Sequence, residues 1–307
     1  QEENGFLRLN KEILDIAVNK GKIKVIRGLR IFGAQTKPLH KVLEYSTDPY
    51  IPDVTGSESG AIQFLHQIGI NPKNGSEWKK LVHLSEEEIK KLVTGIIMKR
   101  LNNENAPDDV LGNVYILREE EKESPTRDAK EFATLLNACG RMGKASLGIG
   151  ACLGDKKIKR RAIASLSDYK KEIINSLKWF EENKESKFVF NGNGFVIINA
   201  QDRVMPTIIG TLASILSKSN GFKAGTFIMS MAQLYDGHTK VSLRLSGRNN
   251  DKDLKAVVSE IIKDIDSSEA GGHKNAAGAI IPSANEDELI ERAKEVLGKS
   301  ALEESVL

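Results

Sequence analysis

The last third of the chain alternates short apolar runs with helical stretches, and this alternation limits the fold more than any other feature of the sequence. Apolar runs at 187–190 and 195–199 flank a Gly/Asn turn, which predicts a hairpin. The alternation continues with helices at 206–218, 254–265 and 286–297, and with strands at 226–234, 240–246 and 279–281. Such a succession predicts a compact α/β domain that spans residues 186–307.

The first part of the chain, residues 1–125, carries both helical and strand patterns. Ser85 and Glu88 form a capping box in front of an amphipathic run, so a helix is expected to begin there. The polar stretch 102–126 is predicted to be a connection or a small insertion. Further segments are expected as helices at 10–17 and 59–68 and as strands at 24–26 and 29–32.

Residues 126–185 form a helical connector in this interpretation. Apolar residues recur there at intervals of three and four, which is the period of a helix. Glycines interrupt the pattern at several points. We therefore expect several helices that pack closely on one another.

Composition restricts the kind of protein. A length of 307 residues is enough for two ordinary domains, and the formal charge of +3 is nearly neutral. A nucleic-acid site would therefore be a local basic patch. No apolar run approaches the roughly 18–20 residues that a membrane span needs. The two cysteines, Cys139 and Cys152, fit a reduced cytoplasmic protein. Because the first residue is Gln1, we expect the chain to be part of a longer protein.

The sharpest local motif is GGHKNAAG at 271–278. Paired glycines at Gly271 and Gly272 can turn their backbone N–H groups into a nest for an anionic oxygen. His273 beside such a nest would add a charge-assisted donor, and Asn275 follows two residues later. The alternative is a tight turn in front of the strand at 279–281.

A second constellation lies on the strand at 241–246. Its period of two places Ser242, Arg244 and Ser246 on one face, and Arg248 follows at the strand's end. Arginines and hydroxyls on a single face suit contact with phosphates. The alternative is the solvated face of a half-buried strand.

A third motif is NACGR at 137–141. The small residues beside Arg141 would allow its side chain to enter a cleft between packed elements, with Asn137 one turn earlier. The alternative is a helix–helix contact that requires small residues, with Arg141 exposed.

Together these three motifs resemble one family. A helix with N-A-x-G-R, a strand ending in S-G-R and a G-G-H-x-x-A-A-G segment, in that order, are similar to RecJ-type nucleases of the DHH phosphoesterase superfamily. The segments at 6–14 and 38–52 resemble the archaeal RecJ-like exonucleases, including the GINS-associated nuclease. The G-G-H segment alone is less specific, because alanyl-tRNA synthetases carry a related one.

The resemblance implies an α/β fold: the remainder of a parallel-sheet catalytic domain at 1–125, the connector, and a mixed-sheet DHH-associated domain from residue 186. It implies a single-strand exonuclease that uses two divalent ions, Mn²⁺ or Mg²⁺. The family's N-terminal D-x-D segment and its D-H-H triplet are not recognised in this sequence, so we expect the chain to bind substrate phosphates and to be inactive alone. Two triplets, 251–253 and 264–266, have the D-x-D letters, but they flank or lie on the helix of the last domain. We interpret Asp251 as a helix cap, and Asp264 and Asp266 as solvated residues at a helix end. The expected phosphate-binding residues are Asn137, Arg141, Arg244, Ser246, Arg248, Gly271, Gly272, His273 and Asn275.

The expected partner is single-stranded DNA or RNA, with GINS as a possible protein partner and no membrane. Two other functions stay open. One is a phosphodiesterase of the same superfamily that acts on short RNA or cyclic dinucleotides. The other is a non-catalytic replication scaffold that binds GINS.

Overall fold

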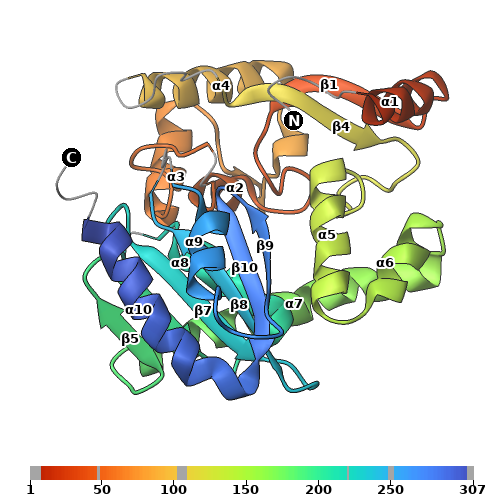
Figure 1. The fold of residues 1–307 in the computed structure, drawn as a ribbon. Coiled ribbons are helices and arrows are strands. Elements are labelled where there is room, and N and C mark those ends of the chain that lie inside the picture. Colours follow the sequence, from red (N-terminus) through yellow and green to blue (C-terminus); the bar gives the residue numbers. More distant parts are fainter. Residues whose placement is uncertain (1–7, 47–48, 102–108, 220, 248–251, 303–307) are drawn as a thin grey trace. The chain divides into compact units, whose positions relative to one another are not determined.

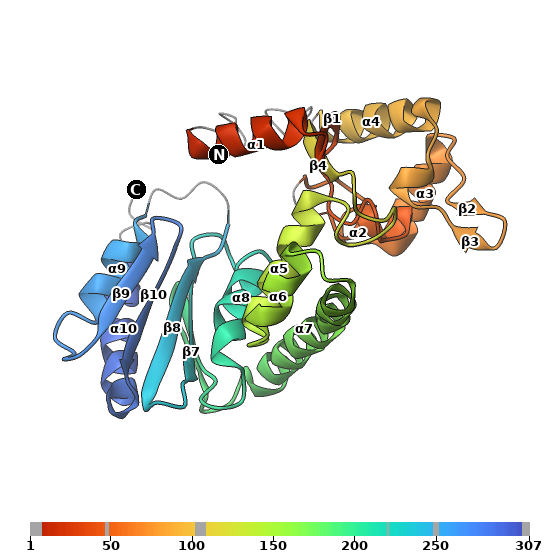
Figure 2. The same ribbon diagram turned by 90° about the vertical axis from the view of Figure 1, so that its right-hand side faces the viewer.

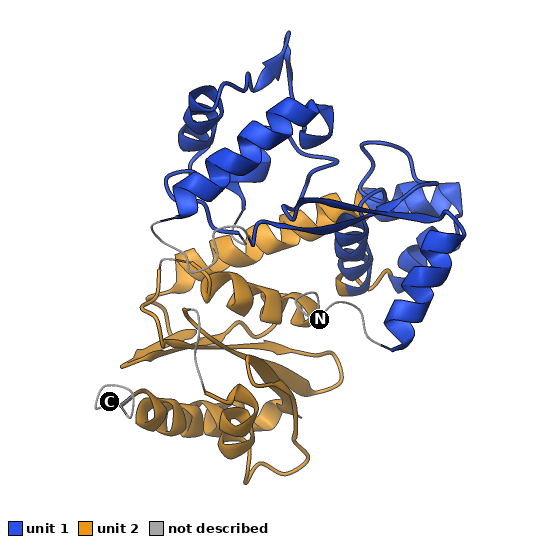
Figure 3. Cartoon of the chain, turned by 90° about the horizontal axis from the view of Figure 1, so that it is seen from above, with its two compact units in different colours: residues 1–140, 145–163 blue, residues 141–144, 164–307 orange. Residues whose placement is uncertain are grey.

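The computed structural model describes residues 8–46, 49–101, 109–219, 221–247 and 252–302. The chain divides into two compact units (Figure 3). Unit 1 comprises residues 1–140 and 145–163, and unit 2 comprises residues 141–144 and 164–307. Within the described residues, none of the helices combines the length and the hydrophobicity that a membrane span requires.

Unit 1 consists of helices and two short antiparallel ribbons, one of which can be followed along the top of Figure 1. Its elements are α1 (Leu9–Asn19), β1 (Ile23–Leu29), α2 (Leu39–Glu44), α3 (Glu58–Gln67), β2 (Lys73–Asn74), β3 (Glu77–Trp78), η1 (Leu81–His83), α4 (Glu86–Arg100), β4 (Leu111–Leu117), α5 (Ala129–Arg141) and α6 (Ala145–Cys152). Strand β1 pairs with β4, and β2 pairs with β3. The apolar core lies among α2, α3 and α4.

The capping box is confirmed. The Ser85 hydroxyl accepts a hydrogen bond from Glu88 N at 3.2 Å, and the Glu88 carboxylate accepts one from Ser85 N at 3.0 Å, so α4 begins as predicted. Two other predictions are wrong. The strand expected at 24–26 belongs to the longer β1, whereas the strand expected at 29–32 is not formed beyond Leu29, and the expected connection contains β4, the partner of β1. Gly28 lies opposite Gly112, so the glycine sits inside the ribbon and does not end a strand.

Unit 2 contains a six-stranded mixed sheet, which confirms the predicted α/β class. Its strands run in the order β5-β6-β7-β8-β10-β9, and among the described strands of the chain β6 and β7 form the one parallel pair. Its elements are β5 (Val189–Gly192), β6 (Phe195–Asn199), α8 (Pro206–Leu216), β7 (Phe227–Gln233), β8 (His238–Leu245), α9 (Leu254–Ile261), β9 (Glu269–His273), β10 (Ala276–Pro282), η2 (Ser283–Asn285) and α10 (Glu286–Leu302). Helix α7 (Lys156–Asn183) begins in unit 1 and continues into unit 2.

Each face of this sheet has its own apolar core (Figure 2). Helix α8 and the end of α7 pack on one face through Ile209, Leu212 and Phe180. Helices α9 and α10 pack on the other through Val258 and Leu289. Because side chains alternate along a strand, the residues of β8 divide between the two faces of the sheet, with Val241 and Leu243 in the core toward α9 and α10.

The GGHKNAAG segment folds as a hairpin. Gly271 and Gly272 lie in the edge strand β9, which pairs with β10, and Lys274 and Asn275 form the turn. The expected loop in front of a three-residue strand is therefore wrong. Strand β10 is longer than predicted because it pairs along its length with both β8 and β9.

Candidate functional site

The strand registers of unit 2 line up rows of residues across β8, β10 and β9. Paired residues in a sheet share a face, so a residue of β8 lies beside its partners on the next two strands (Figure 1). Two rows follow directly from the register, and continuing it by one pair adds the third. The rows are Lys240–Ile280–Glu269, Ser242–Gly278–Gly271 and Arg244–Ala276–His273.

Helix α8 covers only part of this face. It packs on β8, where Arg244 Nε donates a hydrogen bond to Ser214 Oγ at 2.9 Å. A Cβ at Gly210 of α8 would lie 3.0 Å from Ser242 Oγ, so the helix and the strand touch closely. Beyond β8 the face is open, and Ile280 is 43% exposed there. The face therefore forms a hollow beside α8.

We call this hollow the trough. It has a volume of about 380 Å³, and its walls are Arg141, Lys240 and Arg244, with the middle row as its floor. The floor is almost free of side chains because two of its three residues are glycines. A Cβ at Gly271 would have no heavy atom within 4 Å, so this position is open space. A ligand can therefore approach the backbone of β9.

The other two glycines are required by the backbone. Gly272 has a φ of 125°, which favours glycine, and a Cβ there would lie 2.4 Å from Ala276 O. A Cβ at Gly278 would lie 2.4 Å from Val241 O. Gly272 and Gly278 allow β8, β10 and β9 to pack closely, whereas Gly271 keeps the trough open. This division of roles replaces the predicted nest.

Two guanidinium groups are held at the trough by backbone carbonyls and a hydroxyl. Arg141 Nη1 donates to Thr207 O at 2.7 Å, at the first turn of α8. Arg244 Nη1 donates to Leu243 O at 2.8 Å and to Ala277 O at 3.3 Å. Burial and the neighbouring Arg141 lower the pKa of Arg244, but an arginine stays protonated in proteins. Both groups therefore bring fixed positive charge.

Lys240 supplies a third cation. Its side chain is half-buried on the first row, and within the described residues it makes no hydrogen bond or ion pair with the protein. Burial lowers the pKa of Lys240, and the charges of Arg141 and Arg244 lower it further. No carboxylate forms an ion pair with any of the three cations among the residues that the structure describes. Glu269 also lines the trough, so three cations face one carboxylate there, and the net positive charge can attract an anion.

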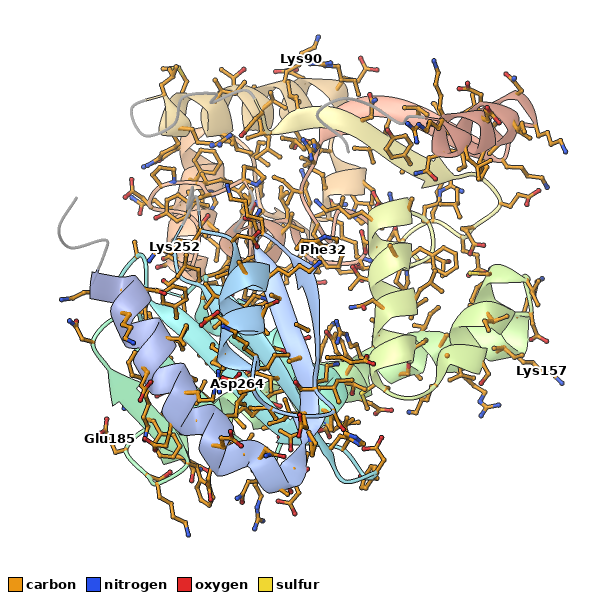
Figure 4. The ribbon with its side chains drawn as sticks, viewed as in Figure 1. Phe32, Lys90, Lys157, Glu185, Lys252 and Asp264 are labelled. Carbon is orange, nitrogen blue, oxygen red and sulfur yellow. The ribbon has the colours of Figure 1, made fainter. Side chains whose placement is uncertain are left out.

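Arg244 also borders a second, larger basic hollow. We call it the lysine hollow. Its volume is about 720 Å³, and it shares Arg244 and Ala276 with the trough. Its lysines are Lys218, Lys252 and Lys274. Lys252, labelled in Figure 4, donates to Ser300 O and lies over the Phe227 ring at 5.0 Å. The two hollows are adjoining basic depressions with Arg244 between them.

The remaining predicted residues divide into four groups. His273 is exposed and shares a row with Arg244, and Asn275 lines the lysine hollow. Ser246 is only 4% exposed, and its hydroxyl donates to Phe222 O at 3.4 Å, so the structure does not bring it to the trough. Asn137 is exposed on α5 in unit 1, whose placement relative to unit 2 is not described. Arg248 lies outside the described residues.

Sequence reasoning missed Lys240 and left Ser242, although it was placed on the Arg244 face, out of the expected phosphate-binding residues. Both share a strand face with Arg244 through the period of two, so the signal was present. The lysines of the lysine hollow come from three separate segments. Nothing in their local sequence could have indicated that they meet.

The metal centre that the resemblance implies does not fit these residues. Among the described residues, no three His, Cys, Asp or Glu side chains lie together in a way that could hold a metal ion. Asp253 caps α9 by accepting from Lys255 N at 2.9 Å, and Asp264 pairs with Arg292 at 2.7 Å. The predicted cap, Asp251, lies outside the described residues, and Asp253 holds that place.

Two domain-family models match the chain. The DHH-CID domain matches residues 31–113 in unit 1, and the DHHA1 domain matches residues 193–299 in unit 2. The second match includes β8, β9, β10 and α8, so most of the trough lies within a DHHA1 domain.

Comparison with single proteins finds one similar sequence and several similar solved structures. The chain is 30% identical over 297 residues to an uncharacterised protein of Methanocaldococcus jannaschii, covering 96% of this chain and 60% of that protein. It therefore spans about 60% of the length of this curated relative. The fold is similar to CDC45 from Entamoeba histolytica (TM-score 0.52, 8% identity, 94% of this chain and 63% of that one). RecJ from Thermus thermophilus with Mn²⁺ matches at a TM-score of 0.43 and 17% identity, over 56% of this chain and 24% of that one.

Proposed function

Because its DHH-CID and DHHA1 domains make this chain a member of the DHH superfamily, we propose that it is the substrate-binding part of a metal-dependent exonuclease for single-stranded nucleic acid. One observation carries the proposal. Arg141, Lys240 and Arg244 surround an open trough whose floor has almost no side chains, and no described carboxylate pairs with them. Hydrolysis itself belongs to the complete protein in this proposal.

The arrangement suits a phosphate backbone. Guanidinium groups bind phosphate oxygens through charge-assisted hydrogen bonds, and two of them are already fixed by their own contacts. The open floor at Gly271 allows a sugar–phosphate chain to lie along β9. Contacts of this kind position a strand without reading its bases, so binding should be tolerant of sequence.

A strand of nucleic acid could also extend from the trough into the lysine hollow. The lysine hollow adjoins the trough at Arg244, so a strand bound in the trough can continue over further lysines. Binding should then strengthen as the oligonucleotide grows from two nucleotides to the length that fills both hollows. We expect His273, which is exposed in the Arg244 row, to contact a neighbouring phosphate.

The second candidate is a phosphodiesterase for short RNA or cyclic dinucleotides. It is favoured by the trough's own volume of about 380 Å³, because pockets for small ligands commonly enclose about 300–1,000 Å³. In that case affinity would reach its limit at two nucleotides, and the lysine hollow would contribute nothing.

One binding experiment separates these outcomes. Fluorescence anisotropy would measure the affinity of the protein for labelled single strands of 2, 5, 10 and 20 nucleotides (roughly the range of single-strand site sizes). The proposal predicts affinity that rises with length and that Arg244→Gln weakens by about 10-fold or more, as expected for a lost charged hydrogen bond. Lys294→Gln on α10, on the opposite face of the sheet, is the matched control for charge. Equal affinity for Arg244→Gln and the control would overturn the proposal.

A further inference from the structure

We infer that Lys240 is a modification site, which acyl phosphates acylate selectively and whose acylation blocks anion binding in the trough. The inference deepens the proposed function by adding regulation of the same site, and it rests on that function only in requiring that the trough accepts a phosphate group. It assigns to Lys240 a chemistry that neither arginine of the trough can share.

The position of Lys240 allows a reagent to reach it. It lies on β8 between Ala232 of β7 and Ile280 of β10, at the end of the trough opposite Arg244. Ile280 is 43% exposed, so the neighbouring strand leaves this end open. The titratable groups that face Lys240 are Arg141 and Arg244, together with Glu269 on its own row. No ion pair within the described residues joins Lys240 to Glu269.

The state of the amine favours reaction. Only the uncharged amine is a nucleophile, and a lysine that is buried near other cations gives up its proton more readily. Burial, Arg141 and Arg244 all lower the pKa of Lys240. Lys184 of unit 2 is the opposite case, because its hydrogen bond to Glu181 at 3.0 Å raises its pKa. The two lysines therefore differ in the sign of the effect.

The trough supplies the second requirement, which is capture of the reagent. The phosphate of an acyl phosphate would bind to Arg141 and Arg244, as a substrate phosphate would. The acyl carbon, one oxygen away, then lies inside the same hollow as the Lys240 amine. Capture raises the local concentration of the reagent and orients it toward the amine.

The reaction balances without a further reactant. The neutral Lys240 amine attacks the acyl carbon, and an N–C amide bond forms. The bond between the acyl carbon and the phosphate oxygen breaks, and inorganic phosphate leaves with the electron pair. The proton that the amine loses passes to phosphate or water. Lys240 becomes an uncharged acyl-lysine.

Acylation would oppose phosphate binding in two ways. It removes one of the three positive charges of the trough, and charge removal of this kind weakens recognition of anions. The acyl group also occupies space at the end of the hollow. A cell with abundant acyl phosphate would then hold the protein in a form that binds nucleic acid weakly.

The test uses acetyl phosphate on the intact 307-residue protein, with mass spectrometry to follow acetylation of Lys240 and Lys184 in the same sample. We expect Lys240 to react faster than Lys184, because burial and the two arginines lower the pKa of Lys240, whereas the hydrogen bond to Glu181 raises the pKa of Lys184. Inorganic phosphate should slow the reaction of Lys240 and leave Lys184 unchanged. Equal rates, or a Lys240 rate that phosphate does not alter, would overturn the inference.

Two further arms link the modification to binding. Acetic anhydride carries no phosphate, so the preference for Lys240 over Lys184 should fall when it replaces acetyl phosphate. Anion binding, with labelled oligonucleotide and with inorganic phosphate as probes, is then compared before and after acetyl phosphate treatment in the wild type and in Lys240→Arg. The inference requires a loss in the wild type and no change on treatment in Lys240→Arg; the same change in both would refute it.

Failure of the proposed function would look different. An unmodified protein that does not bind single strands, but whose Lys240 is still acetylated selectively and protected by phosphate, would refute nucleic-acid binding and leave the modification site standing.

Discussion

Replacing Gly271 by valine should close the trough without destabilising unit 2. A Cβ at this position has no heavy atom within 4 Å, and its φ is not in the left-handed region, so the backbone accepts a side chain. Valine is favoured in strands, and we expect the free energy of unfolding to stay equal or to rise by up to about 1 kcal/mol. The new side chain would stand on the floor of the trough that Arg141 and Arg244 also line.

The effect on binding follows from what the side chain displaces. A phosphate that can no longer reach the two guanidinium groups loses at least one charged hydrogen bond, which is worth about 1.5–3 kcal/mol. The affinity for a single-stranded oligonucleotide should therefore fall by about 10- to 100-fold. Anisotropy titration measures this loss, and thermal unfolding in the same buffer measures stability.

Gly278→Val is the contrasting variant. Its Cβ would lie 2.4 Å from Val241 O, so the β8–β10 pair must shift, at a cost of about 1–3 kcal/mol. In a unit of about 150 residues this lowers the melting temperature by about 2–4 °C for each kcal/mol. The reasoning is refuted if Gly271→Val binds as tightly as the wild type while folded, or if it is destabilised as much as Gly278→Val.

Two other predictions concern single side chains. Glu131 is 3% exposed and accepts hydrogen bonds from Gln35 N at 2.9 Å and Thr36 Oγ1 at 2.6 Å, and burial raises its pKa above the ordinary 4.5. The folded state then binds the proton more tightly than the unfolded state, so this carboxyl contributes stability below pH 4.5 that is lost as the pH rises through the folded pKa. Urea denaturation should show that Glu131→Gln loses less stability than the wild type over this rise, and equal losses would contradict it. Ser246→Ala should leave oligonucleotide affinity unchanged and cost at most about 1 kcal/mol of stability, because its hydroxyl contacts Phe222 O inside unit 2; a loss of affinity in anisotropy would show that Ser246 reaches the ligand.

The sequence predicted those parts of the site that depend on local pattern. The period of two along β8 correctly placed Ser242 and Arg244 on the same face, and the capping box correctly marked the start of α4. The motif residues Arg141, Arg244 and Gly271 all line the trough. The sequence indicated that Gly271 and Gly272 are important, but it did not predict that they lie in a strand, because glycine is common both in loops and in hairpins.

The burial of individual side chains and the pairing of distant strands depend on tertiary packing, which the sequence of one strand does not determine. Whether a polar residue on the Arg244 face is buried or open is decided by which segments lie over the sheet at that position, as Phe222 does at Ser246. Ser246 is covered, whereas Lys240 borders the hollow, although both belong to the same alternating set. Strand β4 was missed because its partner β1 lies about 90 residues away in the sequence.

The central claim is that Arg141, Lys240 and Arg244 neutralise phosphates of a single strand in the trough. The most direct measurement is the slope of log affinity against log salt concentration for the wild type and for the triple variant Arg141→Gln, Lys240→Gln, Arg244→Gln. Each phosphate contact on a single strand contributes about 0.7 to the magnitude of this slope. The slope of the triple variant should therefore be smaller in magnitude than that of the wild type by about 2. Identical slopes in two folded proteins would contradict the claim.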